Sequence, residues 1–268
     1  MEQALASRDV TQREYRTELD GQFQVWDARY LPLSADGQPA DQLLMVATEV
    51  TEQRAAQEAR FEAAIAQREM LVKEVHHRIK NNLQGVAGLL QQIATRKPEV
   101  AGVMAEVVGQ VQAIAQVYGL QVGMNGPLRV RSVLEAITGS VQRTFGRTIV
   151  FDVQGPEPQA WALPEAESIP IALTVNELLT NAIKHSAGEA PVSCTLVCGD
   201  DGVQIVIGNE GRLSEGFSLA QFPGGVSGLG LVRALLPRRS AKLSIEAQGT
   251  RVVAVIDLKP PGVARAGA

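Results

Sequence analysis

Long helical periodicity dominates the chain after residue 51. The segment 52–97 contains two glycines and no proline, and helix-forming residues predominate. Pro98 ends this segment, and helical periodicity resumes over 99–121 before a glycine- and proline-containing stop signal at 123–127. The pattern predicts two long helices joined by a tight turn. In the first helix apolar residues recur three or four positions apart: Leu71, Val75, Ile79, Leu83, Val86, Leu89, Leu90 and Ile93.

Such an αα-hairpin carries more apolar surface than its two helices can bury against each other. Dimerisation into a four-helix bundle is the usual way to bury the remainder. The sequence therefore predicts a homodimer. A monomeric hairpin packed against the domain that follows is the alternative.

The C-terminal half alternates between the two periodicities. Helical patterns lie at 130–145, 169–186 and 229–236, and strand patterns lie at 148–153, 192–198, 203–208, 243–247 and 251–258. Strands that pair locally, with helices over one face, describe an α/β sandwich in an α+β protein. Residues 259–268 are expected to form a loose tail.

Period-two alternation marks the N-terminal region. Three strands are expected within residues 14–50, separated by a turn at Asp20-Gly21 and a second turn at 34–40. A sheet of three antiparallel strands makes a poor ligand pocket, so no sensory cofactor is expected there. The expected organisation is a β region at 1–51, a helical hairpin at 52–126, a sandwich domain at 127–258 and a tail at 259–268.

Composition excludes several classes of protein. With 268 residues, 45% hydrophobic and 20% charged, the chain is long enough for about two folded domains. A net charge of −4 provides no basic field for nucleic acid. No run of 18 apolar residues and no secretory signal pattern occurs, so no membrane span and a cytoplasmic location are expected. The two cysteines, Cys194 and Cys198, are expected to be buried free thiols rather than zinc ligands.

Two of the three histidines, His76 and His77, are adjacent within the first long helix. At helical spacing His77, Lys80, Asn81 and Gln84 share a polar face. An exposed imidazole is mostly neutral at pH 7 and is then a nucleophile. A solvated helix face, with one histidine against the core, is the alternative explanation.

The run His77-Arg78-Ile79-Lys80-Asn81 resembles the phosphoacceptor box of bacterial sensor histidine kinases, in the subgroup whose box reads His-Arg-x-Lys-Asn. The resemblance implies that His77 is the phosphorylated residue and that His76 is a neighbour. The run at 49–53 is similar to the end of a PAS sensor domain, usually Asp-Ile-Thr-Glu, with Glu49 in place of Asp. Residues 1–51 would then be the C-terminal remnant of a PAS domain.

A helical segment at 176–185 places Glu177, Asn181 and Lys184 (or His185) on one polar side. A carboxylate can orient a nucleophile, an amide oxygen can ligate Mg²⁺, and a cation can meet phosphate oxygens. A solvated helix face would show the same residue types. The segment resembles the N-box of the ATP-binding domain shared by histidine kinases, gyrase-type ATPases and related chaperones. The resemblance implies that Asn181 holds Mg²⁺ and that Glu177 matches the water-activating carboxylate of the gyrase-type members.

Two glycine-containing motifs follow in the order expected of this superfamily. The run 224–231, which includes Gly228-Leu229-Gly230, resembles the G2 box that ends the ATP lid. The G1 box usually reads Asp-x-Gly-x-Gly, with the Asp accepting a hydrogen bond from the adenine amino group. Here Asn209 stands at the Asp position, Gly211 at the first glycine and Leu213 at the second. Asn209 keeps an acceptor oxygen but lacks the charge.

Together these resemblances imply the transmitter of a histidine kinase that uses ATP and Mg²⁺ to phosphorylate His77, and that then passes the phosphoryl group to an aspartate of a response regulator receiver domain. A second hypothesis is a dimeric phosphotransfer or scaffold protein whose sandwich domain no longer binds nucleotide, which Asn209 and Leu213 favour. A third is a hydrolytic ATPase that uses Glu177 to orient water.

Overall fold

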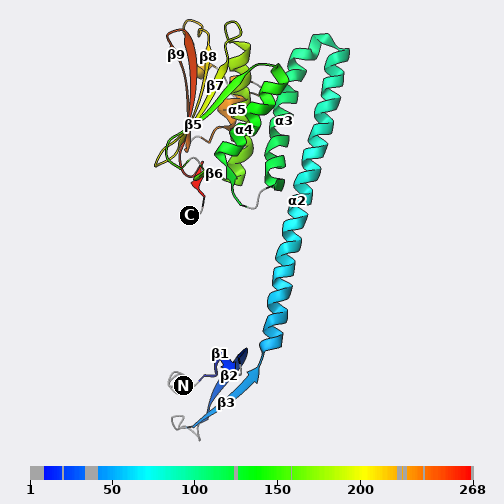
Figure 1. Ribbon diagram of the computed structural model, residues 1–268, viewed down its shortest axis with the longest axis vertical. Coiled ribbons are helices and arrows are strands. Elements are labelled where there is room, and N and C mark those ends of the chain that lie inside the picture. Colours follow the sequence, from blue (N-terminus) through cyan, green and yellow to red (C-terminus); the bar gives the residue numbers. More distant parts are fainter. Residues whose placement is uncertain are drawn as a thin grey trace. The chain divides into compact units, whose positions relative to one another are not determined.

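The computed structural model describes two compact units, Met1–Leu71 and Val72–Ala268 (Figure 1). Some expected features, namely Asp20, the turn at 34–40, Met124-Asn125 and parts of the glycine-rich run (Gly224, Val226 and Ser227), lie outside the residues described. Those described are 9–19, 21–33, 42–123, 126–157, 159–221, 225, 228–237 and 239–266.

The first unit contains a three-stranded antiparallel sheet in the order β1-β2-β3, as the alternation predicted. Its strands are β1 (Thr11–Leu19), β2 (Gln22–Leu33) and β3 (Gln42–Glu49). Among the side chains of this sheet that the structure describes, the buried apolar ones are Ala28 and Tyr30, a small core for three strands. The Thr51 hydroxyl accepts a hydrogen bond from the Val25 backbone N–H at 2.9 Å, which ties the start of the following helix to β2.

The predicted αα-hairpin is confirmed. Helix α2 (Thr51–Arg96) begins in the first unit and ends in the second, just before the 3-10 turn η1 (Pro98–Val100). Helix α3 (Ala101–Gly123) returns antiparallel to the second half of α2 (Figure 1). The side chain of Lys80 on α2 reaches across α3, where a Cβ at Gly119 would lie 3.3 Å from its Cδ.

Helix α3 is unusually apolar. Together with the preceding turn, Pro98–Val122 is long and apolar enough to cross a membrane by length and composition alone. In the second unit α3 packs against α4 (Val130–Phe145) and α5 (Glu165–Lys184). Ala113 and Val117 are each 1% exposed and belong to the same core as the sheet that follows. This packing buries only part of the apolar surface of α3, because Val103 is 61% exposed.

The second unit is completed by a five-stranded sheet in the order β5-β7-β8-β10-β9, in which β5 and β7 are parallel and the other neighbours antiparallel. Helices α4 and α5 pack on one face of it (Figure 1). The predicted α+β architecture is therefore confirmed. The strands are β5 (Ile149–Gln154), β7 (Val192–Cys198), β8 (Val203–Glu210), β9 (Ala241–Gln248) and β10 (Arg251–Leu258).

Buried and less buried residues alternate along the strands, and the buried ones form the side of the sheet that faces the core. In β7 every second residue is buried, from Val192 to Cys198. Cys194 and Cys198 are both free and buried, as expected, and burial raises the pKa of the Cys194 thiol to about 12. These thiols therefore act as small apolar side chains.

The structure differs from the expectation at the start of α5 and in the C-terminal segment. Helix α5 begins at Glu165 rather than near 169 and contains Pro170, whose missing N–H costs one hydrogen bond early in the helix. The C-terminal segment, expected to be a loose tail, packs against the domain, because Val263 is fully buried. The segment also contributes to a small second sheet in the order β11-β6-β4, made of β4 (Leu128–Arg129), β6 (Trp161–Leu163) and β11 (Ala264–Arg265).

Candidate functional site

The two adjacent histidines occupy different environments on α2. His76 is half-buried, with its ring 5.4 Å from the Tyr118 ring on α3, and its Nδ1 has no hydrogen-bond partner. His77 is exposed. Solvent can therefore reach the ring of His77 more readily than that of His76.

The polar face predicted around His77 is present except for Lys80. His77, Asn81 and Gln84 are exposed, and the Asn81 amide lies 3.2 Å from His77 Nδ1. Lys80 is half-buried because its stem crosses α3 at Gly119. Arg78 forms an ion pair with Glu74 at 2.7 Å, and the hydrogen bond and charge of Arg78 hold the pKa of the Glu74 carboxyl below its usual range.

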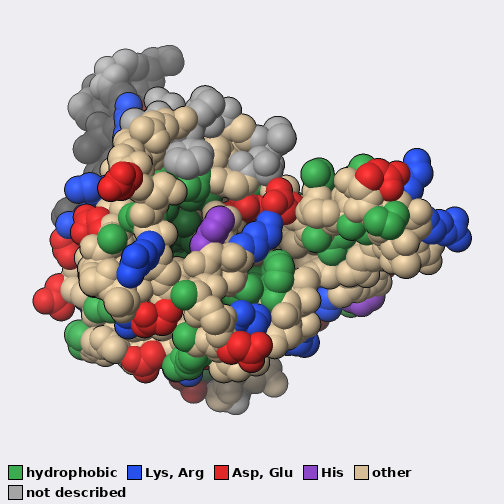
Figure 2. Space-filling view, turned by 90° about the horizontal axis from the view of Figure 1, so that it is seen from above, with side chains coloured by type: hydrophobic (Ala, Val, Ile, Leu, Met, Phe, Trp, Pro, Cys, Tyr) green, Lys and Arg blue, Asp and Glu red, His purple; other side chains and the backbone are tan. Residues whose placement is uncertain are grey.

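A cavity of about 630 Å³ lies in the second unit beside α5. Three separate stretches of sequence converge on it: the helix α5 segment around Asn181, the end of β8 at Asn209, and the start of helix α6 (Gly228–Leu235). Figure 2 shows apolar side chains within a hollow of the molecular surface and a histidine beside them. The lining residues include Leu178, Asn181, Ala182, His185, Ile207, Asn209, Arg212, Phe217, Gly228, Leu229, Gly230, Ile245, Val252 and Ala254.

Asn209 retains its acceptor. Its side chain belongs to a residue that is only 5% exposed, and Nδ2 donates to the Glu210 carbonyl oxygen at 3.1 Å. Oδ1 is therefore the atom left to accept a hydrogen bond from a ligand. Gly211 makes close packing possible, because a Cβ there would lie 2.8 Å from the His185 carbonyl oxygen.

Glu177 and Lys184 do not line the cavity. Gln110 on α3 donates to Glu177 Oε1 at 2.9 Å, and Lys184 Nζ pairs with Glu106 on α3 at 2.7 Å. Glu177 is only 4% exposed, so little water reaches its carboxylate. The hydrogen bond from the Gln110 amide replaces part of that lost hydration. The polar side predicted for α5 is thus divided between the cavity, which takes Asn181, and α3, which takes the two charged residues.

The sequence did not predict two of the cavity residues, and it gave a third only as an alternative. His185 was the alternative to Lys184, and the structure places His185, rather than Lys184, in the lining. Arg212 and Phe217 also line the cavity. No spacing rule pointed to them, because both lie in irregular chain after the G1 glycine, where no periodicity indicates a direction.

The residues present fit Mg²⁺ only as a metal shared with a ligand. Over the described part of the chain no group of three or more His, Cys, Asp and Glu side chains could hold a metal ion. Mg²⁺ usually keeps several waters and takes one or two protein ligands besides the phosphates. The amide of Asn181, which lines the cavity, is a suitable oxygen ligand of this kind.

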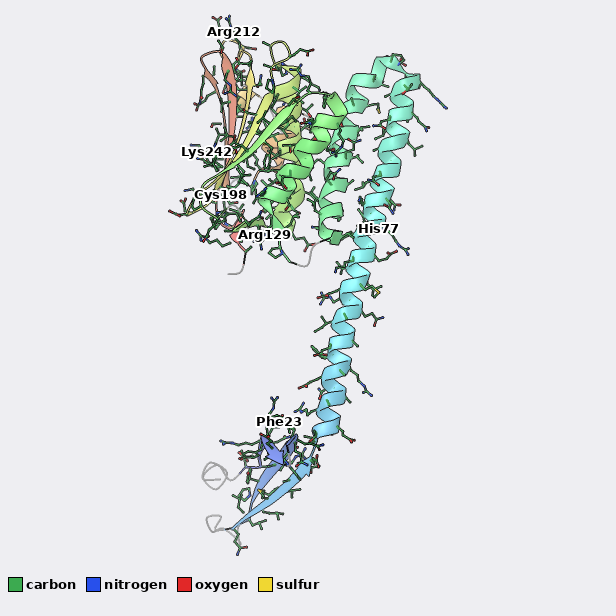
Figure 3. The ribbon with its side chains drawn as sticks, in the orientation of Figure 1. Phe23, His77, Arg129, Cys198, Arg212 and Lys242 are labelled. Atoms are coloured by element: carbon green, nitrogen blue, oxygen red, sulfur yellow. The ribbon has the colours of Figure 1, made fainter. Side chains whose placement is uncertain are left out.

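The cavity and His77 are separated within the second unit. Figure 3 shows Arg212, a cavity residue, at one end of this unit and His77 toward the other. A ligand in the cavity is thus not beside the His77 of the same chain in this conformation.

Comparison with known families finds a match at the hairpin. Residues 74–145 match the profile of the family HisKA_2, described as histidine kinase. This segment contains the predicted box, all of α3 and α4. The resemblance seen in the box is thereby confirmed.

Curated relatives extend the similarity beyond that segment. The sensor histidine kinase PdtaS of Mycobacterium tuberculosis is 28% identical over 222 residues, which cover 78% of this chain and 41% of the relative. PdtaS of Mycolicibacterium smegmatis is 27% identical over 229 residues, covering 82% of this chain and 44% of the relative. The chain thus spans less than half the length of these relatives. Among solved structures, the histidine kinase domain of the Erythrobacter litoralis blue-light activated kinase EL346 matches with a TM-score of 0.48, 19% identity, and coverage of 72% of this chain and 94% of that chain.

Proposed function

We propose that this chain is the transmitter part of a sensor histidine kinase, which transfers the γ-phosphoryl group of ATP to His77 and then to an aspartate of a response regulator. The observation that carries the proposal is the convergence on one cavity of Asn181, Asn209 and the Gly228–Gly230 run. These residues come from three motifs separated in sequence, and the same chain carries the phosphoacceptor box.

The cavity suits a nucleotide in shape and polarity. Apolar residues of α5 and of the sheet (Leu178, Ile207, Val252 and Ala254) offer flat surface to a base, and Asn209 Oδ1 can accept from its amino group. His185 and Arg212, which line the cavity, can donate to phosphate oxygens. Mg²⁺, when bound through Asn181, would neutralise charge on the phosphates.

The proposed chemistry depends on positioning. Neutral imidazole at His77 supplies the electron pair, and the chain needs only to align it with the γ-phosphorus and exclude water. Because the cavity and His77 lie toward opposite ends of the second unit, transfer requires either movement of α2 relative to the cavity or the His77 of a second copy. The proposal places this reaction in the cytoplasm, where ATP is available.

One alternative has an observation in its favour. A phosphotransfer or scaffold protein that binds no nucleotide would explain the neutral Asn209 and the attachment of Glu177 and Lys184 to α3. Calorimetric titration with Mg·ATP separates the two functions. The kinase requires saturable binding, and a flat titration at millimolar nucleotide would establish the scaffold instead.

Asn209 provides a graded test of the same cavity. Asn209→Ala removes the acceptor and is expected to weaken ATP binding by about 1 kcal/mol, or about fivefold. Asn209→Asp supplies a charged acceptor and is expected to tighten binding by a similar factor, although it loses the bond to the Glu210 carbonyl. Gln204→Ala, at an exposed position on the same strand, is the matched control and should bind like wild type. Equal affinities in all four proteins would show that Asn209 does not meet the base.

We further propose that the hairpin dimerises through α2. Its exposed apolar residues in the second unit form two groups with three- and four-residue spacing, Val72 and Val75, then Val86, Leu89 and Ile93, between 44% and 62% exposed. A row of this kind matches the seam of a helical bundle. Ile79 and Leu83, expected to share it, are half-buried.

Leu89 allows a clean test of the dimer because it is 62% exposed within one chain. Light scattering on the wild-type protein should report about twice the chain mass of 28.6 kDa. Leu89→Glu is expected to give the monomer mass, because an unpaired charge buried in the seam costs several kcal/mol. Thr95→Glu, at another exposed position of α2, should stay dimeric. A monomeric wild type at high micromolar concentration would contradict the four-helix bundle.

A further inference from the structure

Helix α3 holds a carboxylate of α5 that lies next to the cavity but does not line it. The Gln110 amide nitrogen donates to Glu177 Oε1 at 2.9 Å, where α3 packs against α5 (Figure 1). Glu177 is only 4% exposed. A buried carboxylate needs hydrogen-bond donors in place of water, so this bond helps to fix the direction of the Glu177 side chain.

Two further contacts bring α3 close to α5 beside this pair. Lys184 Nζ bonds Glu106 Oε1 at 2.7 Å. Gly109 has no side chain, and a Cβ there would lie 3.4 Å from Asn176 Nδ2. This side of α5 is therefore packed against α3, which leaves little room for water beside Glu177.

The side of α5 that meets α3 borders the side that lines the cavity. Leu178 and Asn181 line the cavity, and Glu177 is the residue before Leu178 and one turn before Asn181. At about 3.6 residues per turn, position 177 lies about 40° around the helix axis from position 181. A change of the Glu177 rotamer, with α5 in place, therefore turns its carboxylate from α3 toward the edge of the cavity at Asn181.

A carboxylate at that edge would change which molecule accepts the phosphoryl group. Water competes with His77 for the γ-phosphorus, and a carboxylate can act as a general base toward water. In that reaction the carboxylate takes a proton from water while the water oxygen bonds to the γ-phosphorus. The bond from phosphorus to the bridging oxygen breaks, and ADP leaves with that electron pair. The products are ADP and inorganic phosphate, and His77 stays unmodified.

We infer that Gln110 is a positioning residue that keeps Glu177 on the α3 side of α5, and thereby limits hydrolysis of the bound ATP so that the γ-phosphoryl group is kept for His77. The inference rests on the proposed kinase function and adds selectivity for the acceptor to it. It differs from the hypothesis of a hydrolytic ATPase, because it assigns rapid hydrolysis only to a chain that lacks the bond between Gln110 and Glu177.

Release of inorganic phosphate from Mg·ATP tests the inference in the full chain carrying His77→Gln, which has no ring to accept the phosphoryl group. In this background Gln110→Ala is expected to raise kcat for hydrolysis by about fivefold or more, because the freed carboxylate acts as a base. The KM for ATP should change little, since Gln110 does not line the cavity. Gln110→Met keeps the side-chain length without a donor and should give the same rise, which separates the lost bond from lost packing.

Two variants identify the group responsible for the rise. Gln112→Ala is the matched control, because Gln112, on the same helix, accepts from Thr144 Oγ1 at 3.4 Å instead of bonding Glu177. It should hydrolyse ATP at the rate of the His77→Gln parent. Adding Glu177→Gln to Gln110→Ala should restore that rate, since an amide is not a base. No rise in either Gln110 variant, or a rise that persists without the carboxylate, would overturn the inference.

Calorimetric titration of the same proteins with Mg·ATP separates this inference from the proposed function. If the wild type shows no saturable binding, the proposed function fails, and the inference fails with it. If the proteins bind Mg·ATP and the Gln110 variants hydrolyse it no faster than the parent, the inference alone fails. In a chain that retains His77, Gln110→Ala should also lower the ratio of protein label to released phosphate, and an unchanged ratio would count against Gln110 as the residue that favours His77 over water.

Discussion

His77→Gln is expected to abolish the label that the wild-type chain takes up from γ-labelled ATP. Glutamine keeps a polar side chain at this exposed helical position but has no nucleophilic ring nitrogen. The label should be a phosphoramidate, which is labile in acid and stable in base. The label that the protein retains before and after acid or base treatment measures both the amount of phosphorylation and the chemical linkage.

His76→Gln is the matched control for this experiment. His76 contacts Tyr118 and is half-buried, so its replacement should lower stability modestly and leave a substantial part of the label. Equal labelling of wild type and His77→Gln would refute His77 as the phosphoacceptor. Loss of label in both variants, with both folded, would mean that the two rings act together.

Asn181→Ala is expected to reduce labelling at least a hundredfold. Asn181 is the cavity residue whose amide oxygen suits a hard cation, and a phosphoryl transfer without charge neutralisation loses several kcal/mol of transition-state stabilisation. Single-turnover labelling measures the rate. If the variant still binds Mg²⁺ weakly, the loss of labelling rate should be smaller at high Mg²⁺ concentration.

Glu165→Ala tests whether that loss is specific to the cavity. Glu165 is exposed in the first turn of the same helix, away from the cavity lining, so this variant should label at the wild-type rate. Circular dichroism checks that both variants retain the fold. Wild-type labelling by Asn181→Ala would remove Asn181 from the proposed site.

The elements with strong periodicity could be predicted from the sequence. Helix α4 and strands β7 and β10 begin and end at the expected residues, since each carries a regular apolar pattern that one packed face requires. The short strands β4 and β6 could not be predicted, because two or three residues carry no measurable period. Their pairing depends on contacts with residues distant in sequence.

The residue types of the candidate site could be predicted from the sequence, but which element each side chain faces could be predicted only in part. Helical spacing grouped Glu177, Asn181 and Lys184 on one polar side, and spacing alone cannot say which neighbour that side meets. In the structure positions 177 and 184, two turns apart, meet α3, while positions 181 and 185, one turn apart, meet the cavity. The difference arises because α3 packs against α5, a tertiary contact with no local signal.

Helix α3 shares its core with the sheet, whereas α2 does not, and this difference decides which helix of the hairpin can move relative to the sheet domain. Ala113 and Val117 of α3 are buried with the residues of the sheet domain, so pulling α3 away would expose apolar surface and break its bonds to Glu177 and Lys184. Ala87 is the only buried residue of α2, which the structure describes over its full length. Movement of α2, which carries His77, would therefore expose less apolar surface than movement of α3 away from the sheet domain.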